Sequence, residues 1–390
     1  MSTIPKIKRN YVPEFNEISN CIIINPIFVS NYNNQNNNTE IYNLVKSIDL
    51  NVKKHESLKI RRPSPTLLFG KGQIEKIKIL LNSNFIKLLI INYQISPSQQ
   101  RNLEKTLDCK ILDRTALILE IFGKRAKTNE GKIQVDLASL LYQKTRLVRT
   151  WTHLERQRGG FGFMGGPGER QIESDKRQIN NRIIKLKKQL NKIELNRNMQ
   201  RKLRKNNSVP IISLVGYTNV GKSSLFNLLT KENIYVKNQL FATLDTTMRK
   251  VKVEDSSKCE FILSDTVGFI SNLPTELVVS FKSTLEEICY SNYIVHVIDI
   301  SNPEWETQKK IVNETLLDIL KNDYSKNKIV EVWNKSDKLN KNEINFLNNR
   351  IKRLKYSNII LFSTFNNEGK QELVRTLNKK LFMEQNNEKN

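Results

Sequence analysis

Residues 210–224 read Pro-Ile-Ile-Ser-Leu-Val-Gly-Tyr-Thr-Asn-Val-Gly-Lys-Ser-Ser, an apolar run that leads into a glycine-rich loop. Residues 216–223 match G-x-x-x-x-G-K-[ST], and a helical pattern follows. Glycines let such a loop wrap phosphates with its N–H groups, the lysine reaches the β- and γ-phosphates, and the serine hydroxyl holds Mg²⁺. The alternative is a glycine turn with an exposed lysine. Because a strand and a helix flank the loop, we predict a phosphate-binding P-loop that uses Lys222 and Ser223.

A second motif, Asp265-Thr266-Val267-Gly268, follows the apolar run 261–263. An aspartate at a strand end can hold Mg²⁺ through water, and the N–H of the glycine can sense a γ-phosphate. The tetrad is a weak signal alone. Its position 42 residues beyond Ser223, in the same predicted domain, makes it a strong one.

The third motif, Asn334-Lys335-Ser336-Asp337, follows the apolar run 329–333. A carboxylate there can accept hydrogen bonds from the guanine N1–H and 2-amino groups, and adenine offers no such donor pair. A helix cap would explain this tetrad in isolation. As the third motif in order on successive strands, it predicts that Asp337 selects GTP over ATP.

Apolar runs alternate with helical patterns in two parts of the chain, which predicts an α/β fold class. The later part is expected to form a doubly wound, mostly parallel sheet, with strands near 211–215, 261–263, 294–300, 329–333 and 359–362 and a last helix at 371–382. The earlier part suggests a smaller α/β domain, with strands at 88–92 and 111–113 and helices at 73–81, 98–107 and 115–122.

Between these parts, the sequence predicts a two-helix antiparallel hairpin. Apolar residues recur at helical spacing from about 130 to 156, and Ile172, Ile179, Leu186 and Ile193 fall seven residues apart, as in a coiled coil. The glycine-rich segment 159–168 separates the two helices. Ordinary bundle packing is the alternative explanation of the heptads. The resulting division is a loose tail at 1–20, an α/β domain at 21–128, a basic hairpin at 129–206, a GTPase domain at 207–382 and a polar tail at 383–390.

Positive charge is concentrated in the hairpin. The chain of 390 residues carries 64 Lys and Arg against 39 Asp and Glu, a net charge of +25. Residues 144–206 hold 18 Lys and Arg against 5 Asp and Glu, a net +13. Such a cluster favours a polyanion, because neutralised phosphates release counterions. An AT-rich genome would raise lysine everywhere but would not cluster it, so we predict nucleic-acid binding.

Other classes of protein are disfavoured by what the sequence contains. The four cysteines (Cys21, Cys109, Cys259 and Cys289) lie far apart and there are only three histidines, so neither a zinc site nor a disulfide framework is expected. Isolated thiols suit a reducing cytosol. The longest apolar runs are too short to span a membrane, and we expect a cytoplasmic protein without a membrane span.

The three motifs are those of the translation-factor-like P-loop GTPases, and the chain from about residue 60 to 380 resembles the HflX family. The resemblance is carried by Asp113-Arg-Thr, Arg125-Ala-Lys-Thr-Asn-Glu-Gly, Thr145-Arg-Leu-Val-Arg-Thr-Trp-Thr-His-Leu-Glu-Arg, Gly165-Gly-Pro-Gly-Glu and Phe241-Ala-Thr-Leu-Asp. It implies a monomeric GTPase that binds the large ribosomal subunit and its RNA, is stimulated by it, and separates stalled or idle ribosomes under stress. A GTP-gated RNA-binding or ribosome-assembly module is the alternative.

The resemblance also implies which residues form the GTP site. Thr243 is implied as the switch threonine on Mg²⁺ together with Ser223, a choice that the sequence alone does not make over Thr246 or Thr247. Lys222, Thr243, Asp265 and Gly268 are the expected catalytic residues. The expected nucleotide contacts are Gly216, Tyr217, Thr218, Asn219, Val220, Gly221, Lys222, Ser223, Ser224, Phe241, Ala242, Thr243, Leu244, Asp245, Asp265, Thr266, Val267, Gly268, Asn334, Lys335, Ser336, Asp337, Ser363 and Thr364.

Two positions depart from common patterns. Ser363-Thr364 stands where the family usually has Ser-Ala, and its backbone N–H can still meet the guanine carbonyl. Phe269 follows D-x-x-G where many GTPases have a water-orienting glutamine. We therefore predict slow hydrolysis that depends on a partner; the alternative is that Phe269 only packs the switch.

Three further features remain open. Asn219 occupies the place of a K⁺-coordinating asparagine, or it stabilises its own loop. Residues 159–168 form either an RNA-contacting tip with Phe161, Phe163 and Met164, or a flexible linker. Gly70-Lys-Gly72 is either a turn or part of a second nucleotide site, such as one for ATP.

Overall fold

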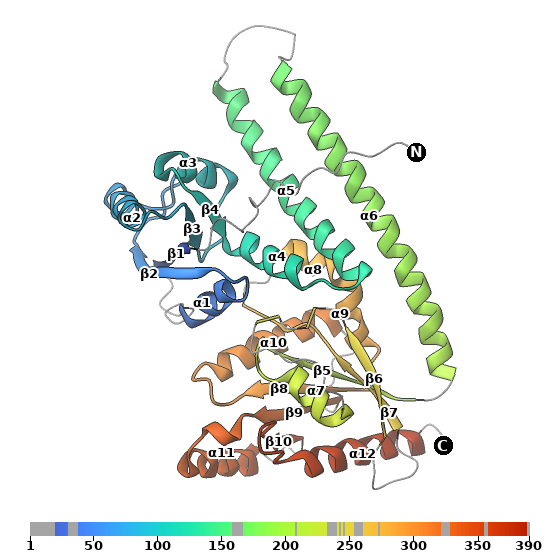
Figure 1. Cartoon of the computed structure of the whole chain (residues 1–390). Coiled ribbons are helices and arrows are strands. Elements are labelled where there is room, and N and C mark those ends of the chain that lie inside the picture. The colour runs from blue at the N-terminus through green and yellow to red at the C-terminus, as the bar shows by residue number, and fades with distance from the viewer. Residues whose placement is uncertain are drawn as a thin grey trace. The chain divides into compact units, whose positions relative to one another are not determined.

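The computed structural model describes residues 20–29, 38–157, 167–206, 209–231, 240–241, 243–244, 246–252, 260–271, 274–320, 328–354 and 358–387. The chain forms two compact units (Figure 1). One contains residues 1–124 and 140–180, and the other contains residues 125–139 and 181–390. Two long helices contribute residues to both units. The predicted loose tail and the glycine-rich tip lie outside the described residues, apart from Asn20 and residues 167 and 168.

The first unit is built on a parallel sheet with strand order β2-β1-β3-β4. Its strands are β1 (Asn20–Phe28), β2 (Asn51–Ile60), β3 (Leu88–Ile91) and β4 (Lys110–Asp113). Its helices are α1 (Asn38–Lys46), α2 (Lys71–Ser83), α3 (Pro97–Leu107) and α4 (Arg114–Arg125). The sequence predicted β3, β4 and the last three helices, but not β1, α1 or β2.

Both faces of this sheet are buried. Side chains alternate between the two faces of a strand, and Ile22 and Ile24 of β1 pack with Ile77 of α2 and Leu103 of α3. The intervening residue Ile23 is equally buried, so the opposite face is covered as well. This double cover explains the continuous apolar runs of β1 and β3.

The helix α2 bears on the open question about Gly70-Lys-Gly72. Gly70 is the N-cap of α2, with φ of −73°, and its N–H donates to the side-chain oxygen of Gln73 at 3.1 Å. An ordinary helix start therefore accounts for this glycine signal.

The predicted hairpin consists of α5 (Asn129–Gln157) and α6 (Pro167–Asn206). Within the second unit, Arg197 of α6 forms an ion pair with Glu130 at the start of α5 at 2.7 Å. A contact between the end of one helix and the start of the other requires an antiparallel pair. Ile183 and Leu186 are buried while Lys187 and Lys188 are exposed, so apolar residues form the packed side of this part of α6.

The second unit contains a six-stranded sheet with order β10-β9-β8-β5-β7-β6. Its strands are β5 (Ile211–Gly216), β6 (Thr247–Lys252), β7 (Glu260–Asp265), β8 (Tyr293–Asp299), β9 (Ile329–Asn334) and β10 (Ile359–Leu361). Only β6 runs antiparallel to its neighbour. All predicted strands of this domain are present, β6 is added, and the fold class is confirmed.

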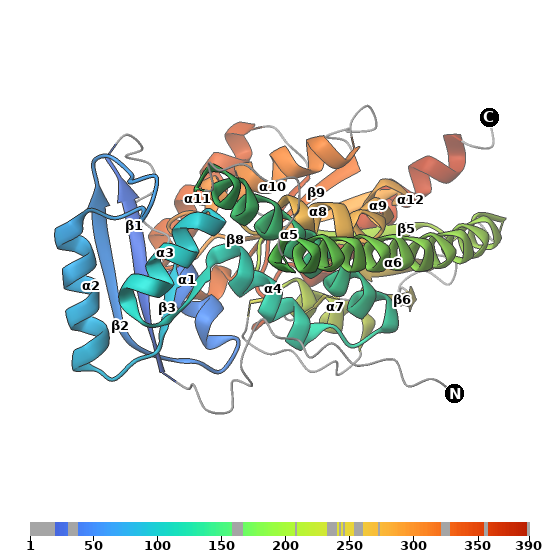
Figure 2. The same cartoon turned by 90° about the horizontal axis from the view of Figure 1, so that it is seen from above.

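The second unit also contains helices, which Figure 2 labels in a view from above. They are α7 (Lys222–Thr230), α8 (Thr275–Ser280), α9 (Lys282–Cys289), α10 (Trp305–Leu320), α11 (Lys341–Leu354) and α12 (Lys370–Asn387), with a 3₁₀ turn at Ser336–Lys338. No helix in the described part of the chain is long and apolar enough to cross a membrane. Nor do the described residues gather three or more His, Cys, Asp or Glu side chains into a metal-binding cluster.

Candidate functional site

The predicted site residues meet at one edge of the second sheet. The P-loop follows β5, the Asp265 motif ends β7, the Asn334 motif follows β9, and Ser363 and Thr364 follow β10. All four strands are parallel, so their carboxyl ends share an edge, which is where ligands of such folds bind. Ala242 and Asp245, both predicted contacts, lie outside the described residues.

The P-loop adopts the conformation that its glycines allow. Gly221 has a φ of +98°, which side chains rarely adopt, and a Cβ atom there would collide with the side chain of Asn334. Asn219 also has a positive φ, +63°, and asparagine is one of the few residues that tolerate it. The loop therefore needs these residue types for its shape, before any ligand is considered.

Lys222 begins α7 and lies inside the loop. Its Nζ donates to the carbonyl oxygens of Gly216 at 3.2 Å and Tyr217 at 2.9 Å. Burial lowers the pKa of Lys222 to about 8, and the nearby Asp265 carboxylate opposes that shift. A buried ammonium that has mainly carbonyl partners is well suited to an anionic phosphate, which forms stronger charge-assisted hydrogen bonds.

Three oxygen-bearing side chains converge beside the P-loop. The hydroxyls of Ser223 and Thr243 lie 2.7 Å apart, and both donate to Asp265 Oδ2, at 2.7 and 2.9 Å respectively. Burial raises the pKa of Asp265, whereas Lys222 and the two hydroxyls oppose that rise. The other oxygen, Asp265 Oδ1, is buried and has no hydrogen-bond partner among the described residues.

Thr243 is thus the threonine that reaches Ser223. Thr247 lies in β6, and the buried hydroxyl of Thr246 has no partner among the described residues. The neighbouring Phe241 and Leu244 are buried, so apolar residues flank the position of Thr243.

The Asp265 motif packs directly under the P-loop. The N–H of Phe269 donates to the Gly216 carbonyl at 3.0 Å, and the N–H of Thr218 donates to the Phe269 carbonyl at 2.8 Å. A Cβ atom on Gly268 would lie 3.0 Å from Lys222 Nζ, so a side chain there would crowd the lysine. The Phe269 side chain is 3% exposed. It packs in the core and has no polar atom with which to orient water.

The guanine motif is held by the loop after β10. Asn334 Nδ2 donates to the Val220 carbonyl at 2.8 Å, and the N–H of Thr364 donates to Asn334 Oδ1 at 3.2 Å. Ser363 Oγ donates to Asp337 Oδ1 at 2.6 Å, which orients that carboxylate. Thr364 acts here through its backbone, so threonine in place of the usual alanine leaves this arrangement intact.

Sequence reasoning missed Asp299, the last residue of β8. Its Oδ2 accepts a hydrogen bond from Lys335 Nζ at 2.5 Å, and the same Nζ donates to the Asn219 carbonyl at 2.9 Å. Its Oδ1 accepts from the N–H and the hydroxyl of Ser301, at 3.1 and 2.6 Å. Asp299 therefore joins the guanine motif to the P-loop through Lys335. No local motif marks it; its position at a strand end of the sheet edge was the available signal.

We expect Asp299→Ala to weaken GDP binding about tenfold or more, because charged hydrogen bonds of this kind contribute roughly 1.5–3 kcal/mol. Equilibrium titration with a fluorescent GDP analogue measures the effect. Ser301→Ala is the matched control, since it removes one contact to Oδ1 and leaves the ion pair with Lys335 in place. Equal GDP affinity in Asp299→Ala and the parent chain would contradict the assigned role.

Comparison with known proteins agrees with this site. Three family profiles match: "GTP-binding GTPase N-terminal" over residues 35–123, "GTP-binding GTPase Middle Region" over 125–204, and "50S ribosome-binding GTPase" over 211–335. The chain is 48% identical over 300 residues to GTPase HflX of Magnetococcus marinus, a match that covers 77% of this chain and 68% of that protein. This chain belongs to the HflX family of GTPases.

Other HflX proteins match at similar levels. Identity to GTPase HflX of Flavobacterium psychrophilum is 47%, covering 73% of this chain and 67% of that protein. Identity to GTPase HflX of Escherichia coli is 45%, covering 66% and 60%. The chain therefore spans about two thirds of the length of its HflX relatives. The family and the P-loop domain together show that the protein hydrolyses GTP.

The fold also resembles that of a solved GTP-binding protein. A structure described as a complex of SsGBP and GDP superimposes with a TM-score of 0.52 at 25% identity, covering 94% of this chain and 98% of that one. The likeness extends over all three regions of the HflX chain.

Proposed function

We propose that this HflX GTPase is a cytoplasmic monomer that binds the large ribosomal subunit and, in its GTP state, separates stalled or idle ribosomes during stress. The subunit would in turn stimulate hydrolysis. The observation that carries the proposal is α6, a helix of 40 residues. Its exposed side chains include Arg177, Arg182, Lys185, Lys187, Lys188 and Lys192. A helix with this surface suits RNA phosphates, and the match to the profile described as "50S ribosome-binding GTPase" supports the same partner.

The GTP site fits a magnesium ion. Ser223, Thr243 and Asp265 present hard oxygen ligands, the kind that Mg²⁺ prefers, and Asp265 Oδ1 is buried without a partner among the described residues. Ser223 and Thr243 would hold the ion through their hydroxyls, and Asp265 would hold it through water. The ion would neutralise charge that develops on the transferred phosphoryl group.

Residues of this chain would bind the phosphates and respond to the presence of the γ-phosphate. Lys222 binds the β- and γ-phosphates, and the N–H of Gly268 senses the γ-phosphate. GTP would hold Thr243 and Gly268 in place, and loss of the γ-phosphate would release both segments. Since Phe269 is buried and apolar, the attacking water needs another orienting group, and we assign that contribution to the ribosome-bound state.

Sedimentation of ribosomes tests the splitting activity. Incubation of whole ribosomes with the protein and a non-hydrolysable GTP analogue should convert them to subunits, visible as a shift in a sucrose gradient. The alternative, a GTP-gated assembly or RNA-binding module, predicts intact ribosomes in that assay and accumulation of subunit precursors when the gene is deleted. Whole ribosomes that persist at saturating protein would contradict splitting.

The hairpin tip is expected to make the decisive contact with ribosomal RNA. Residues 158–166 lie outside the described residues, so this prediction rests on sequence: Phe161, Phe163 and Met164 can stack on unpaired bases, and Arg156, Arg158 and Arg170 can pair with phosphates. Replacing the three apolar residues together with serine should leave GTP binding intact and remove ribosome stimulation and splitting. A triple variant that splits ribosomes at the parental rate would identify the tip as a linker.

Potassium dependence is a further expectation at Asn219. A K⁺ ion held beside this residue would neutralise phosphate charge as an arginine finger does in other GTPases. The alternative is that asparagine is present because it tolerates the positive φ of the loop. Turnover in KCl and in NaCl at equal ionic strength distinguishes the two, because a K⁺ site predicts faster turnover in KCl and a purely conformational role predicts equal rates.

A further inference from the structure

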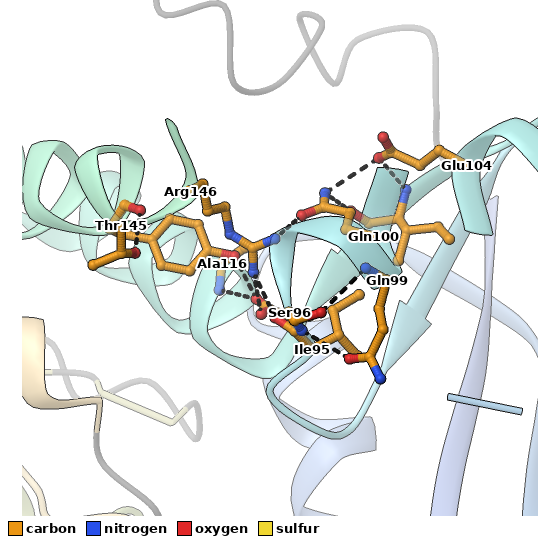
Figure 3. Close-up of polar contacts among 11 residues, drawn as sticks. Ile95, Ser96, Gln99, Gln100, Glu104, Ala116, Thr145 and Arg146 are labelled. Atoms are coloured by element: carbon orange, nitrogen blue, oxygen red, sulfur yellow. Dashed lines mark hydrogen bonds and ion pairs between the residues drawn. The ribbon is translucent and has the colours of Figure 1, made fainter. Parts of the chain in front are cut away.

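Two sequence segments that the GTP site does not use lie against each other in the first unit. Asp113 ends β4 and begins the Asp113-Arg-Thr segment, and Arg146 lies in the Thr145-Arg-Leu segment of α5. Although 33 residues separate them, Arg146 Nη2 donates to Asp113 Oδ2 at 2.6 Å. Figure 3 shows the surrounding hydrogen bonds.

Asp113 is fully buried, and both of its oxygens are used. Oδ1 accepts from the N–H of Ala116 and from the hydroxyl of Tyr142, each at 2.8 Å, and Oδ2 accepts from Arg146. Burial raises the pKa of Asp113, while Arg146 and the hydrogen bonds from Ala116 and Tyr142 oppose that rise. Two of these partners, Tyr142 and Arg146, belong to α5 and lie one helical turn apart.

Arg146 reaches beyond Asp113 to the helix α3. Its Nη1 donates to the side-chain oxygen of Gln100, and its Nη2 also donates to the Ile95 carbonyl at 3.3 Å. The guanidinium stacks over the Tyr142 ring with 4.3 Å between its carbon and the ring centroid. Gln100 in turn donates to the Ile111 carbonyl at 2.9 Å (Figure 3). One arginine of α5 therefore connects β4, α3 and the loop that precedes α3.

The neighbouring polar groups of the same edge are also bonded to one another. Arg114 donates to Asn92 Oδ1 at 2.8 Å and forms an ion pair with Glu40, and Asn92 donates to Asn25 at 3.0 Å. Asn92 directly follows β3, and Asn25 is the β1 residue just beyond the last pair between β1 and β3, near the carboxyl end of β3, where doubly wound folds usually bind ligands. Because these groups are engaged with each other, the edge acts as a packed connection and we do not assign it a ligand.

A buried ion pair contributes less to stability than to geometry. The loss of hydration of both charges offsets their attraction, so replacing such a pair with apolar residues of similar size often costs no stability. The pair instead restricts the relative orientation of the elements that carry it, because the planar guanidinium meets the carboxylate in a fixed geometry. Here that geometry relates the direction of α5 to the sheet.

We propose that Asp113 and Arg146 are positioning residues that set the direction in which α5 leaves the N-terminal sheet. The hairpin would thereby be presented to its RNA partner in one orientation. The presentation of the hairpin to RNA, the second step, rests on the proposed ribosome function. The direction of α5, the first step, concerns this chain alone. The test therefore measures the two steps separately.

The first measurement is a distance distribution in the full-length chain. Spin labels are placed at Lys78→Cys on α2 and Ser174→Cys on α6, both exposed positions of the first unit, after Cys259 and Cys289 are replaced by serine. The test variant carries Asp113→Leu and Arg146→Met. Glu40→Gln is the matched control, because it removes the charge from a neighbouring ion pair, Arg114–Glu40. The parent and the control should give one narrow distribution, and the test variant a broader or shifted one.

The second measurement is GTP hydrolysis by the same variants. Without ribosomes, the test variant should hydrolyse GTP at the parental rate. With large subunits, its hydrolysis rate should be at least about tenfold lower than that of the parent. The midpoint of thermal unfolding should be the same in both proteins. A distribution equal to the parent's would overturn the positioning role. If the parent itself is not stimulated by large subunits, the proposed function fails while the distances still decide the first step. Should the double variant not fold, Asp113→Asn, which keeps the shape and the Ala116 contact, serves as the test variant under the same criteria.

Discussion

Lys222→Ala is expected to abolish GTP hydrolysis, with a fall in single-turnover rate of about 10³-fold or more, since donors aimed at developing charge in a buried site contribute on this scale. The lysine is 6% exposed, and its Nζ lies within the P-loop, where it donates to the Gly216 and Tyr217 carbonyls. Rapid-quench measurement of phosphate release, together with GTP titration, separates loss of binding from loss of chemistry.

The control for this variant is Lys231→Ala, which removes an exposed lysine just after α7. It should hydrolyse GTP at the parental rate. Lys222→Ala should retain the parental circular dichroism spectrum, because the substitution removes a buried charge rather than creating one. Hydrolysis by Lys222→Ala within tenfold of the parent would mean that another group binds the phosphates.

Asp337→Asn is expected to relax guanine specificity, with GTP affinity falling about 10²–10³-fold, because a site built to accept two hydrogen bonds loses much of its discrimination when one acceptor becomes a donor. Ser363 donates to Asp337 Oδ1, which orients the carboxylate and leaves its other oxygen for the base. The asparagine should also improve binding of xanthosine triphosphate, whose 2-oxo group accepts the new N–H.

Competition binding with GTP, ATP and xanthosine triphosphate measures this change. The gain for xanthosine triphosphate is the internal control, since a misfolded variant would lose every nucleotide together. An unchanged preference for GTP over ATP in Asp337→Asn would contradict base selection by this residue.

The GTP site was the part of the structure most accessible to sequence reasoning. Its motifs are local: a P-loop, an aspartate at a strand end and the guanine tetrad each combine a short strand with a few residues of fixed chemistry. Since parallel strands place their carboxyl ends on one edge of a sheet, the sequence alone predicts that these motifs lie together. The resemblance added Thr243, which the structure places 2.7 Å from Ser223.

Contacts between distant segments could not be predicted in this way. Asp299 acts through Lys335, and their contact depends on the pairing of β8 with β9. Asp113 and Arg146 each belong to a segment quoted for the resemblance, yet neither segment indicates that the two side chains meet. Their ion pair exists because α5 crosses the end of β4, and no periodicity in the sequence encodes that crossing.

The missed elements have a different cause. The strand β2, Asn-Val-Lys-Lys-His-Glu-Ser-Leu-Lys-Ile, lies at the edge of its sheet and is polar along most of its length, so neither alternation nor an apolar run marks it. The helix α1 has nine residues and begins in an asparagine-rich stretch, a composition more typical of a loop than of a helix. Pairing with β1 and burial of Ile41, Leu44 and Val45 stabilise these segments in place of local propensity.

GTP turnover measured with and without purified large ribosomal subunits tests the central claim most directly. We predict slow turnover by the isolated protein, because Phe269 is buried and orients no water. Addition of large subunits should raise the turnover rate at least about 10²-fold. Partner proteins raise the hydrolysis rate of other GTPases by roughly 10³–10⁵-fold. Small subunits serve as the control and should give a much weaker effect. Turnover that is already fast in isolation and unchanged by large subunits would contradict control of this GTPase by the ribosome.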